Sequence, residues 1–334
     1  MFRAVVTALS TLSATAAMTQ GAAPVQDGRT RASASLSQTS WGDPNLQGVW
    51  SSGPMSATPF ERSTELGTRA VLTEAEFAAR VDENRRQAVA DSAPFVRPER
   101  GGAAIGSAPG WLAQERGKPS TQASLIVDPP NGRLPALTED GRLRARRWKE
   151  TADQPAGPEE LNPYDRCITR GVLGSAFPNI YNSAARILQT PTEVVIHYEM
   201  IHETRIIPLD GRPHAPEMLR LYMGDSRGHW EGATLVVETT NFNGRTGSYA
   251  RNGNGNPTSP SLHLVERFTL TGGDVLQYKV RVEDPATYTA PWTVEFPLTR
   301  NDGYTIYEYA CHEGNYALPN ILRGARAAEV QPVP

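Results

Sequence analysis

The chain has 334 residues, of which 39% are hydrophobic and 21% charged, and its formal net charge is −3. This length allows one large or two small domains. A charge this close to zero offers little attraction to a phosphate backbone, so nucleic acid is not expected as a partner.

The amino terminus has the pattern of a secretory signal peptide over residues 1–23. Arg3 is followed by an uncharged stretch over Ala4–Met18 and then by small residues. Cleavage after Ala16 and cleavage after Ala23 both fit this pattern. No later apolar run approaches the roughly 20 residues needed to span a bilayer. The sequence therefore predicts a periplasmic or secreted protein without a membrane span.

Residues 24–160 are rich in Pro, Gly, Ser and Ala, and they predict a region that wraps around a later domain. One helix is predicted near 73–91, because Thr73 and Glu76 form a capping box. The segment over 92–120 is predicted to be a loop or an arm.

Two shorter features of this region carry structural predictions. A first barrel strand is predicted near 47–51, where Gly48-Val49-Trp50 resembles the first strand of lipocalin-like barrels. The basic run over 142–149 is interpreted as the solvated face of a short helix, with an anion site as the alternative.

The sequence pattern of residues 161–324 is typical of an antiparallel β-barrel. Short runs of β-branched and aromatic residues alternate with turn signals such as Asp284-Pro285. Eight or more such strands tend to close, because an open sheet leaves unpaired edges. The sequence predicts a mainly β protein: a lipocalin-like antiparallel barrel with an irregular, partly helical N-terminal region and a tail over 325–334. The predicted strands are 193–200, 204–208, 234–239, 262–270, 275–282, 292–299 and 304–310.

The two cysteines, Cys167 and Cys311, lie near the two ends of this β-rich region. In a chain bound for an oxidising compartment, a disulfide is the natural expectation. It would close a long loop and stabilise the fold by about 4 to 5 kcal/mol in the chain-entropy model. The alternative is a catalytic thiol beside His312, which such a compartment would protect poorly.

Titratable side chains gather in the segment over 184–212. Strand alternation puts Val194, Ile196 and Tyr198 on a core face, and His197 with Glu199 on a face toward solvent or a wet cavity. His197 and His202 are five residues apart, which excludes a zinc-binding helix. A chain reversal after Met200 would free His202 from this alternation.

Two later runs also bear on chemistry. Gly224–Gly228 matches the nucleophile elbow G-x-S-x-G, but a hairpin turn and a strand follow it where the elbow requires a helix. Glu266 shares an apolar face with Leu264, so it needs a partner if buried. Arg205, Arg267 or a histidine could supply that partner.

The motifs DPNLQGVW, DRCITRG, IIPLDGRPH, GDSRGHWEGATLVVETTNFN, HLVERF and YEYACHEGN together resemble a large family of exported proteins from soil bacteria. The resemblance covers Asp43 to about Gly324 and implies export and the fold, without a particular activity. Its central pattern maps onto Glu199, His202 and Arg205. One departure is Ala233, where the family usually has Asp. The other motifs carry Asp210, Arg212, His214, Glu231, Asn243, His263, Glu266, Glu308 and Glu313.

Two functions follow as hypotheses. The first is an exported lyase, isomerase or hydrolase acting on a small organic substrate in the barrel pocket. Glu199 or Glu266 would be its base, His202 or His263 its acid, and Arg205 would bind an anionic group. The second is a periplasmic carrier whose barrel holds an apolar ligand. No cofactor is predicted, a divalent metal is left open, and the substrate-binding candidates are Tyr198, Asp210, Arg212, His214, Asn243 and Glu308.

Overall fold

The structure, a computed structural model, describes residues 37–92, 119–247 and 255–330. The predicted signal peptide over 1–23 and most of the predicted loop over 92–120 lie outside these residues. The strands are β1 (Gly48–Ser51), β2 (Ile126–Asp128), β3 (Ala184–Gln189), β4 (Glu193–Tyr198), β5 (Thr204–Pro208), β6 (Asp225–Glu231), β7 (Thr234–Thr240), β8 (His263–Gly272), β9 (Val275–Glu283) and β10 (Trp292–Arg300). The helices are α1 (Glu74–Asp91), α3 (Glu139–Asp153), α4 (Gly171–Ala176) and α5 (Ala317–Val330), with short 3-10 turns η1 (Gly53–Met55), η2 (Thr64–Leu66), η3 (Pro158–Glu160) and η4 (Met200–His202).

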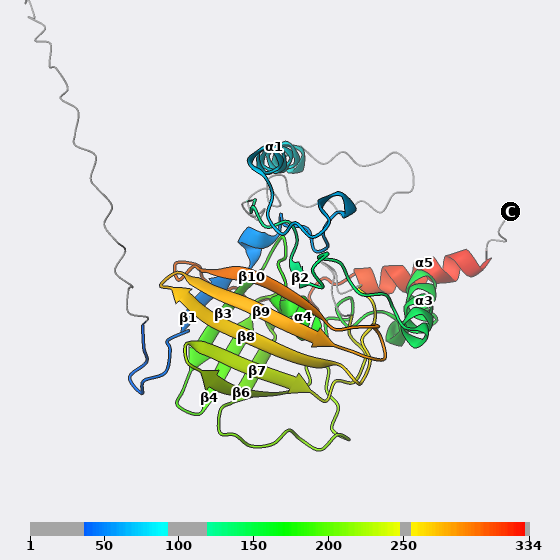
Figure 1. The fold of residues 1–334 in the computed structure, drawn as a ribbon. Helices are drawn as coiled ribbons and strands as arrows, with labels where there is room; N and C mark the ends of the chain where they lie inside the picture. Colours follow the sequence, from blue (N-terminus) through cyan, green and yellow to red (C-terminus); the bar gives the residue numbers. More distant parts are fainter. Residues whose placement is uncertain (1–36, 93–118, 248–254, 331–334) are drawn as a thin grey trace, which may run out of the picture. The chain divides into compact units, whose positions relative to one another are not determined.

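Within the described residues, nine strands form an antiparallel sheet in the order β5-β4-β3-β1-β10-β9-β8-β7-β6, and β2 pairs with β10 beside this path. Figure 1 shows β7, β8, β9 and β10 running side by side. The two ends of the order, β5 and β6, approach each other closely. A Cβ added to Gly228 of β6 would lie 2.8 Å from the side chain of Ile207 of β5. The sheet is therefore a nearly closed barrel, which confirms the predicted fold class.

The strands form where apolar residues alternate with polar ones. On β4, Val194, Ile196 and Tyr198 are buried, as their alternation predicts. On β8, Leu264, Glu266, Phe268 and Leu270 are buried and face the interior. The apolar members of both sets belong to one hydrophobic core inside the barrel. The period of two along each strand thus sets which residues lie inside.

Trp50 of the Gly-x-Trp motif is a buried anchor of β1, the first barrel strand that the sequence predicts. Its side chain is 1% exposed, and its indole N–H donates to the carbonyl of Leu46 over 2.7 Å. The guanidinium of Arg300 lies 4.5 Å from the centre of the indole ring. Such a cation–π contact joins β1 to β10, its neighbour in the sheet.

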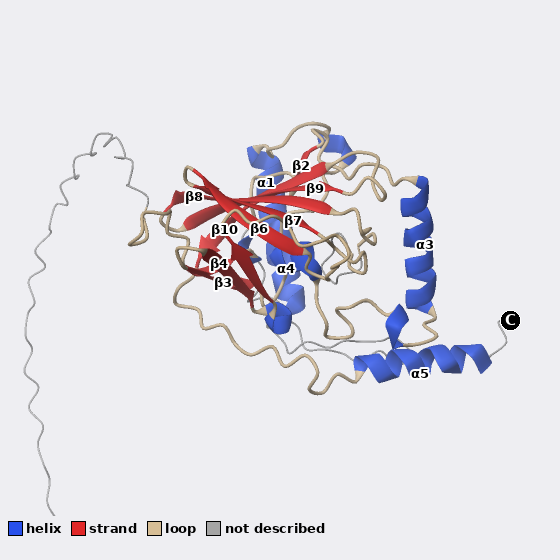
Figure 2. Cartoon of the chain, turned by 90° about the horizontal axis from the view of Figure 1, so that it is seen from below, coloured by secondary structure: helices blue, strands red, loops and turns tan. Residues whose placement is uncertain are grey.

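Among the helices of the described residues, α4 contributes side chains to the barrel core. Its Val172, Leu173 and Ala176 are buried in the barrel cluster, and Figure 2 shows it next to the strands. The capping box of Thr73 and Glu76 begins α1, as predicted. The basic run over 142–149 lies in α3, which confirms the predicted helix. In the described part of the chain, no helix has both the length and the apolar character that crossing a bilayer requires.

The structure corrects three element predictions. The predicted strand over 304–310 has no regular structure, because β10 already pairs with β1 and β9 and the barrel closes at β5 and β6. The hairpin turn that the sequence places directly after Gly228 begins only after Glu231, because Asp225–Glu231 form β6. Residues 325–330 of the predicted tail belong to α5, where Leu318, Ile321 and Leu322 are half-buried; the rest of that tail lies outside the described residues.

Candidate functional site

Arg205 and Glu266 form a buried ion pair inside the barrel. Their side chains are 2% and 0% exposed, and the two guanidinium N–H groups donate to the two carboxylate oxygens over 3.1 and 2.6 Å. This is the partner that the sequence leaves open for Glu266. Burial opposes the charge on Arg205, but the Glu266 carboxylate outweighs it and raises the pKa of Arg205. Arg205 therefore remains charged, and the paired N–H donors give this contact the bidentate geometry of arginine with a carboxylate.

Hydroxyl groups complete the surroundings of this pair. The hydroxyl of Tyr278 donates to Glu266 over 3.0 Å, and Arg205 donates to Ser226 over 3.2 Å. Tyr198, a predicted substrate-binding residue, is buried beside the pair, and burial raises its pKa to about 12. The nearby cavity, lined by Trp50, Tyr198 and others, has a volume of about 20 Å³. That is close to the volume of one water molecule, so this part of the barrel has no room for an organic ligand.

Glu199 and His202 lie outside this interior pair and hold separate partners. Glu199 is 1% exposed, and its Oε1 accepts from the Asn182 amide and the Tyr304 hydroxyl, each over 2.9 Å. His202 is exposed, and its Nδ1 is 3.1 Å from the carbonyl of Tyr309. The chain reverses here, since β4 ends at Tyr198, two residues before the end of the predicted strand, and His202 has a φ of 45°. The reversal buries the carboxylate and exposes the imidazole.

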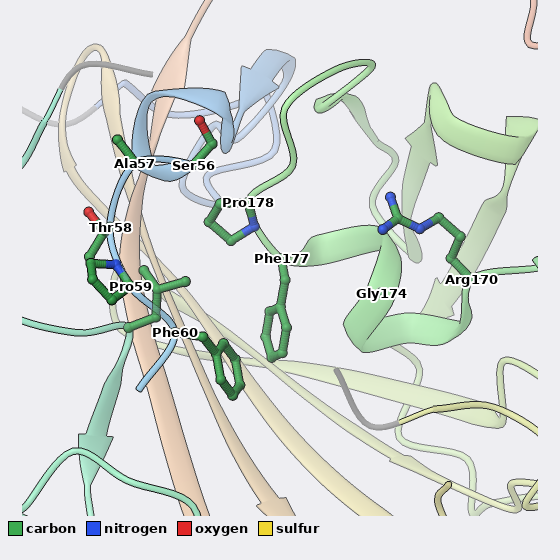
Figure 3. Close-up of a pocket in the computed structure, with 10 residues that line it drawn as sticks. Ser56, Ala57, Thr58, Pro59, Phe60, Arg170, Gly174, Phe177 and Pro178 are labelled. Atoms are coloured by element: carbon green, nitrogen blue, oxygen red, sulfur yellow. The ribbon is translucent and has the colours of Figure 1, made fainter. Parts of the chain in front are cut away.

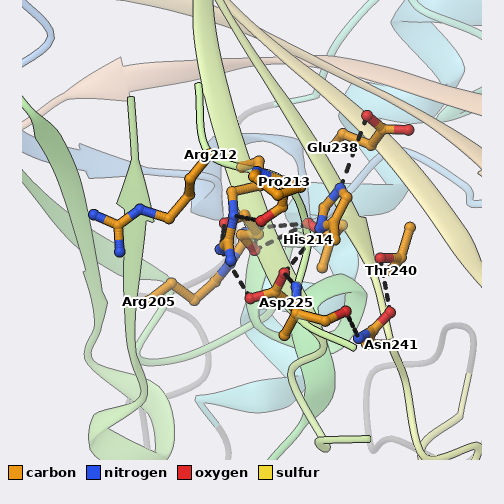
Figure 4. Close-up of polar contacts among 12 residues, drawn as sticks. Arg205, Arg212, Pro213, His214, Asp225, Glu238, Thr240 and Asn241 are labelled. Atoms are coloured by element: carbon orange, nitrogen blue, oxygen red, sulfur yellow. Dashed lines mark hydrogen bonds and ion pairs between the residues drawn. The ribbon is translucent and has the colours of Figure 1, made fainter. Parts of the chain in front are cut away.

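His263 and His214 belong to a row of charged groups on the outside of the barrel. His263 Nε2 is 2.8 Å from Glu238 Oε1, and His214 Nδ1 is 2.9 Å from Asp225 Oδ2. Figure 4 shows His214 between Asp225 and Glu238. Most of these groups are at least partly exposed. The arrangement is that of a solvated row of charges, in which each ion pair contributes little to the stability of the fold.

The remaining predicted substrate-binding residues do not converge either. Asp210 and Arg212 form an exposed ion pair with each other, and Asn243 accepts from the backbone N–H of Arg245. Glu308 lines a pocket of about 480 Å³ beside the disulfide. Within the described ranges, no group of three or more His, Cys, Asp or Glu side chains could hold a metal ion.

The disulfide between Cys167 and Cys311 is present, as the sequence predicts. Next to it, the hydroxyl of Tyr164 hydrogen bonds with those of Tyr181 and Tyr309. Burial raises the pKa of Tyr164 and of Tyr181 to about 12. Both phenols are therefore neutral near pH 7, so this cluster offers hydrogen-bond donors and acceptors but no ready base.

A largely apolar pocket lies at the ends of α4, and we call it the Arg170 pocket. It has a volume of about 360 Å³, within the range of small-molecule sites. Figure 3 shows it between the segment over 56–60 and the residues that flank α4. Its lining residues are Ser56, Ala57, Thr58, Pro59, Phe60, Leu125, Arg170, Gly174, Phe177 and Pro178.

Backbone contacts place the two walls of the Arg170 pocket. Leu125 N–H donates to the Pro59 carbonyl over 2.8 Å, which ties the segment over 56–60 to the residues entering β2. Arg170 and Phe177 are the two caps of α4. The rings of Phe60 and Phe177 lie with their centres 5.6 Å apart and form an aromatic wall.

Arg170 gives this pocket its charge. It is 4% exposed, its guanidinium lies 5.2 Å from the centre of the Tyr164 ring, and burial lowers its pKa. Arginine nevertheless stays charged in proteins. The lining also includes the Thr58 hydroxyl, which is buried and has no hydrogen-bond partner among the described residues. Buried polar groups usually have a partner, so a ligand atom could complete this one.

The sequence offers little that would single out the Arg170 pocket. Arg170 lies in the DRCITRG motif beside Cys167, yet nothing in that motif indicates a partner 110 residues upstream. Comparison of the chain with protein-family models, with curated proteins and with solved structures gave no match. The site therefore has to be interpreted from its own geometry.

Proposed function

We propose that the chain binds a small apolar molecule that carries one anionic group, in the Arg170 pocket. One observation carries this proposal: Arg170 is the charged residue among lining residues that are otherwise apolar or uncharged. A buried cation in a lining that is otherwise uncharged favours a ligand whose carboxylate meets the guanidinium while its body packs on the phenyl rings. An aromatic or aliphatic monocarboxylate has this form.

An acid–base enzyme, the other hypothesis from the sequence, has less support. It would need Glu199 or Glu266 to face a histidine across a shared space. Glu266 bonds to Arg205 and Tyr278 inside the barrel, while His263 lies outside it beside Glu238. Glu199 and His202 likewise have different side-chain partners. Binding is thus the function that the geometry favours.

Export is part of the same proposal, and so is membership of the soil-bacterial family that the motifs resemble. The pattern over 1–23 and the disulfide of Cys167 and Cys311 support export, because disulfides persist in oxidising compartments. Mass spectrometry of the protein recovered from the periplasm tests it. A mature chain beginning at residue 17 or 24 is expected, and a full-length cytoplasmic chain would contradict export.

Calorimetric titration with 1-naphthoate tests the binding proposal, with 1-naphthalenemethanol as a neutral probe of similar size. Arg170→Met should weaken naphthoate binding roughly 10- to 100-fold, the usual effect of removing a hydrogen bond to a charged group. It should leave the weaker binding of the alcohol unchanged. Arg212→Met removes an exposed arginine far along the chain and serves as the control. Equal affinities for both probes would contradict the role of Arg170.

Thr58→Val is a second test of binding in the Arg170 pocket, and it can be used if Arg170→Met fails to fold. Valine has nearly the shape of threonine and removes the buried hydroxyl that lacks a partner among the described residues. The free protein should become slightly more stable, since an unsatisfied polar group is lost. Naphthoate binding should weaken about fivefold, equivalent to about 1 kcal/mol. Unchanged affinity together with unchanged stability would place the ligand elsewhere.

A further inference from the structure

A second pocket lies along one face of α3, and we call it the α3 pocket. Arg144, Arg147, Trp148 and Thr151 follow the i, i+3, i+4, i+7 spacing of a single helical face. All four line a pocket of about 470 Å³. The basic run that looks like a solvated helix face in the sequence thus turns part of its charge toward a cavity.

Two more arginines reach the α3 pocket from other segments. Arg166 precedes Cys167 of the disulfide, and Arg245 follows β7; both line the pocket. Two carboxylates, Glu159 and Glu160, also line it. Four arginines against two glutamates leave an excess of two positive charges.

Most of this positive charge has no counterion within the described residues. Neither Arg147 nor Arg166 forms an ion pair with the part of the chain that the structure describes, and the same holds for Arg245. Arg144 is held in place, because it donates to the Ala286 carbonyl over 2.6 Å and to the Thr287 hydroxyl over 2.8 Å. Its Nε is buried and lacks a partner among the described residues. The pocket thus combines one arginine held in place with three that form no ion pair among the described residues, an arrangement suited to binding an anion.

Aromatic side chains supply the rest of the lining. Trp148 is half-buried on the same face of α3 as the arginines, and Tyr222 lines the pocket from another segment. Flat rings offer stacking surfaces for planar groups. Guanidinium groups match phosphate and carboxylate geometry through pairs of parallel N–H donors.

We propose that the α3 pocket binds an aromatic dianion, a small molecule in which a planar ring carries a phosphate monoester or two carboxylates. The two excess positive charges match the two negative ones, and Trp148 receives the ring. The volume of the pocket suits a ligand of this size. This site is separate from the Arg170 pocket, whose single cation suits a monoanion, and it does not depend on the function proposed there.

Calorimetric titration of the full chain with phenyl phosphate and with phthalate tests this inference, and inorganic phosphate and phenol are the partial probes. At least one aromatic dianion should bind tenfold more tightly than either partial probe. A tighter phenyl phosphate assigns the phosphate monoester, and a tighter phthalate assigns the dicarboxylate. Failure of both aromatic dianions to bind at millimolar concentration, or a partial probe binding as tightly as the tighter of the two, would overturn the proposal.

Substitutions then locate the site. Arg147→Gln combined with Arg166→Gln should weaken binding of the preferred dianion at least tenfold. Arg146→Gln removes an exposed charge next to Arg147 that does not line the pocket, so affinity should change less than twofold. Trp148→Leu should weaken the aromatic dianion without affecting inorganic phosphate, and Arg170→Met should leave both unchanged. An equal loss in Arg146→Gln and in the double variant would show general charge attraction and overturn the site.

Discussion

Two buried arginines illustrate how one residue type takes different roles in this molecule. Arg205 lies inside the barrel, where both carboxylate oxygens of Glu266 accept its hydrogen bonds and offset its charge. Arg170 caps α4 outside the strands, beside the Tyr164 ring, and lines a pocket whose other lining residues carry no charge. The two buried arginines therefore differ in their surroundings: a carboxylate meets Arg205, whereas Arg170 lies beside an aromatic ring.

Packing of side chains also explains why the cavity beside the ion pair is small among the described residues of the barrel. Inward-facing aromatic residues such as Phe268, Tyr278 and Phe296 pack against each other around the ion pair. Their ring centres lie 5.0 and 5.2 Å apart, which leaves only small voids. Space for small molecules appears instead where loops and short helices meet the barrel.

Removal of the disulfide near Arg170 should cause the largest loss of unfolding free energy among the changes considered. Cys167→Ala combined with Cys311→Ala removes a link between residues 144 positions apart. The free energy of unfolding should fall by up to about 5 kcal/mol in the chain-entropy model. Urea denaturation of the variant and the wild type measures it, with the reduced wild type as a control. A loss below about 1 kcal/mol would mean that Arg170 is positioned without this link.

Loss of one partner of the Arg205–Glu266 ion pair inside the barrel should destabilise the protein nearly as much. Glu266→Gln leaves Arg205 charged, buried and uncompensated, so unfolding free energy should fall by about 3 to 5 kcal/mol. Arg205→Met combined with Glu266→Leu should lose less, because no buried charge remains. Chemical denaturation of both variants separates the two cases. If the double variant is less stable than Glu266→Gln, the attraction within the ion pair exceeds the cost of removing its two charges from water.

Much of the barrel could be predicted from local pattern, because alternation on β4 and β8 directly reflects which side chains face inward. The sequence also includes Arg205 among the candidate partners of Glu266, because a buried carboxylate needs a cation or a hydrogen-bond donor next to it. The Arg170 pocket could not be predicted in this way. Its walls come from 56–60, from Leu125 and from the ends of α4, and no local pattern brings these segments together. The unpredicted α4 is also too short to have a clear helical period.

Glu203 connects the two sides of the comparison, and its titration gives the smallest predicted effect. It directly precedes β5, accepts a hydrogen bond from the Thr169 hydroxyl, and receives the backbone N–H of Arg170. Burial raises the pKa of Glu203 above its ordinary value of 4.5 despite these donors. The folded chain therefore holds this proton more tightly than the unfolded chain, and stability from the protonated form is lost as pH rises through the raised pKa.

Glu203→Gln removes that dependence, because glutamine keeps an acceptor for Thr169 and does not ionise. The variant should gain stability relative to the wild type as pH rises from 4 toward 7, by on the order of 1 kcal/mol. Thermal unfolding of both proteins across this range measures the difference, in which other titrations cancel. Glu217→Gln, an exposed change between β5 and β6, should show no such trend. A relative gain that instead grows as pH falls would mean that the hydrogen bonds outweigh burial, and that the ionised Glu203 holds Arg170 in place.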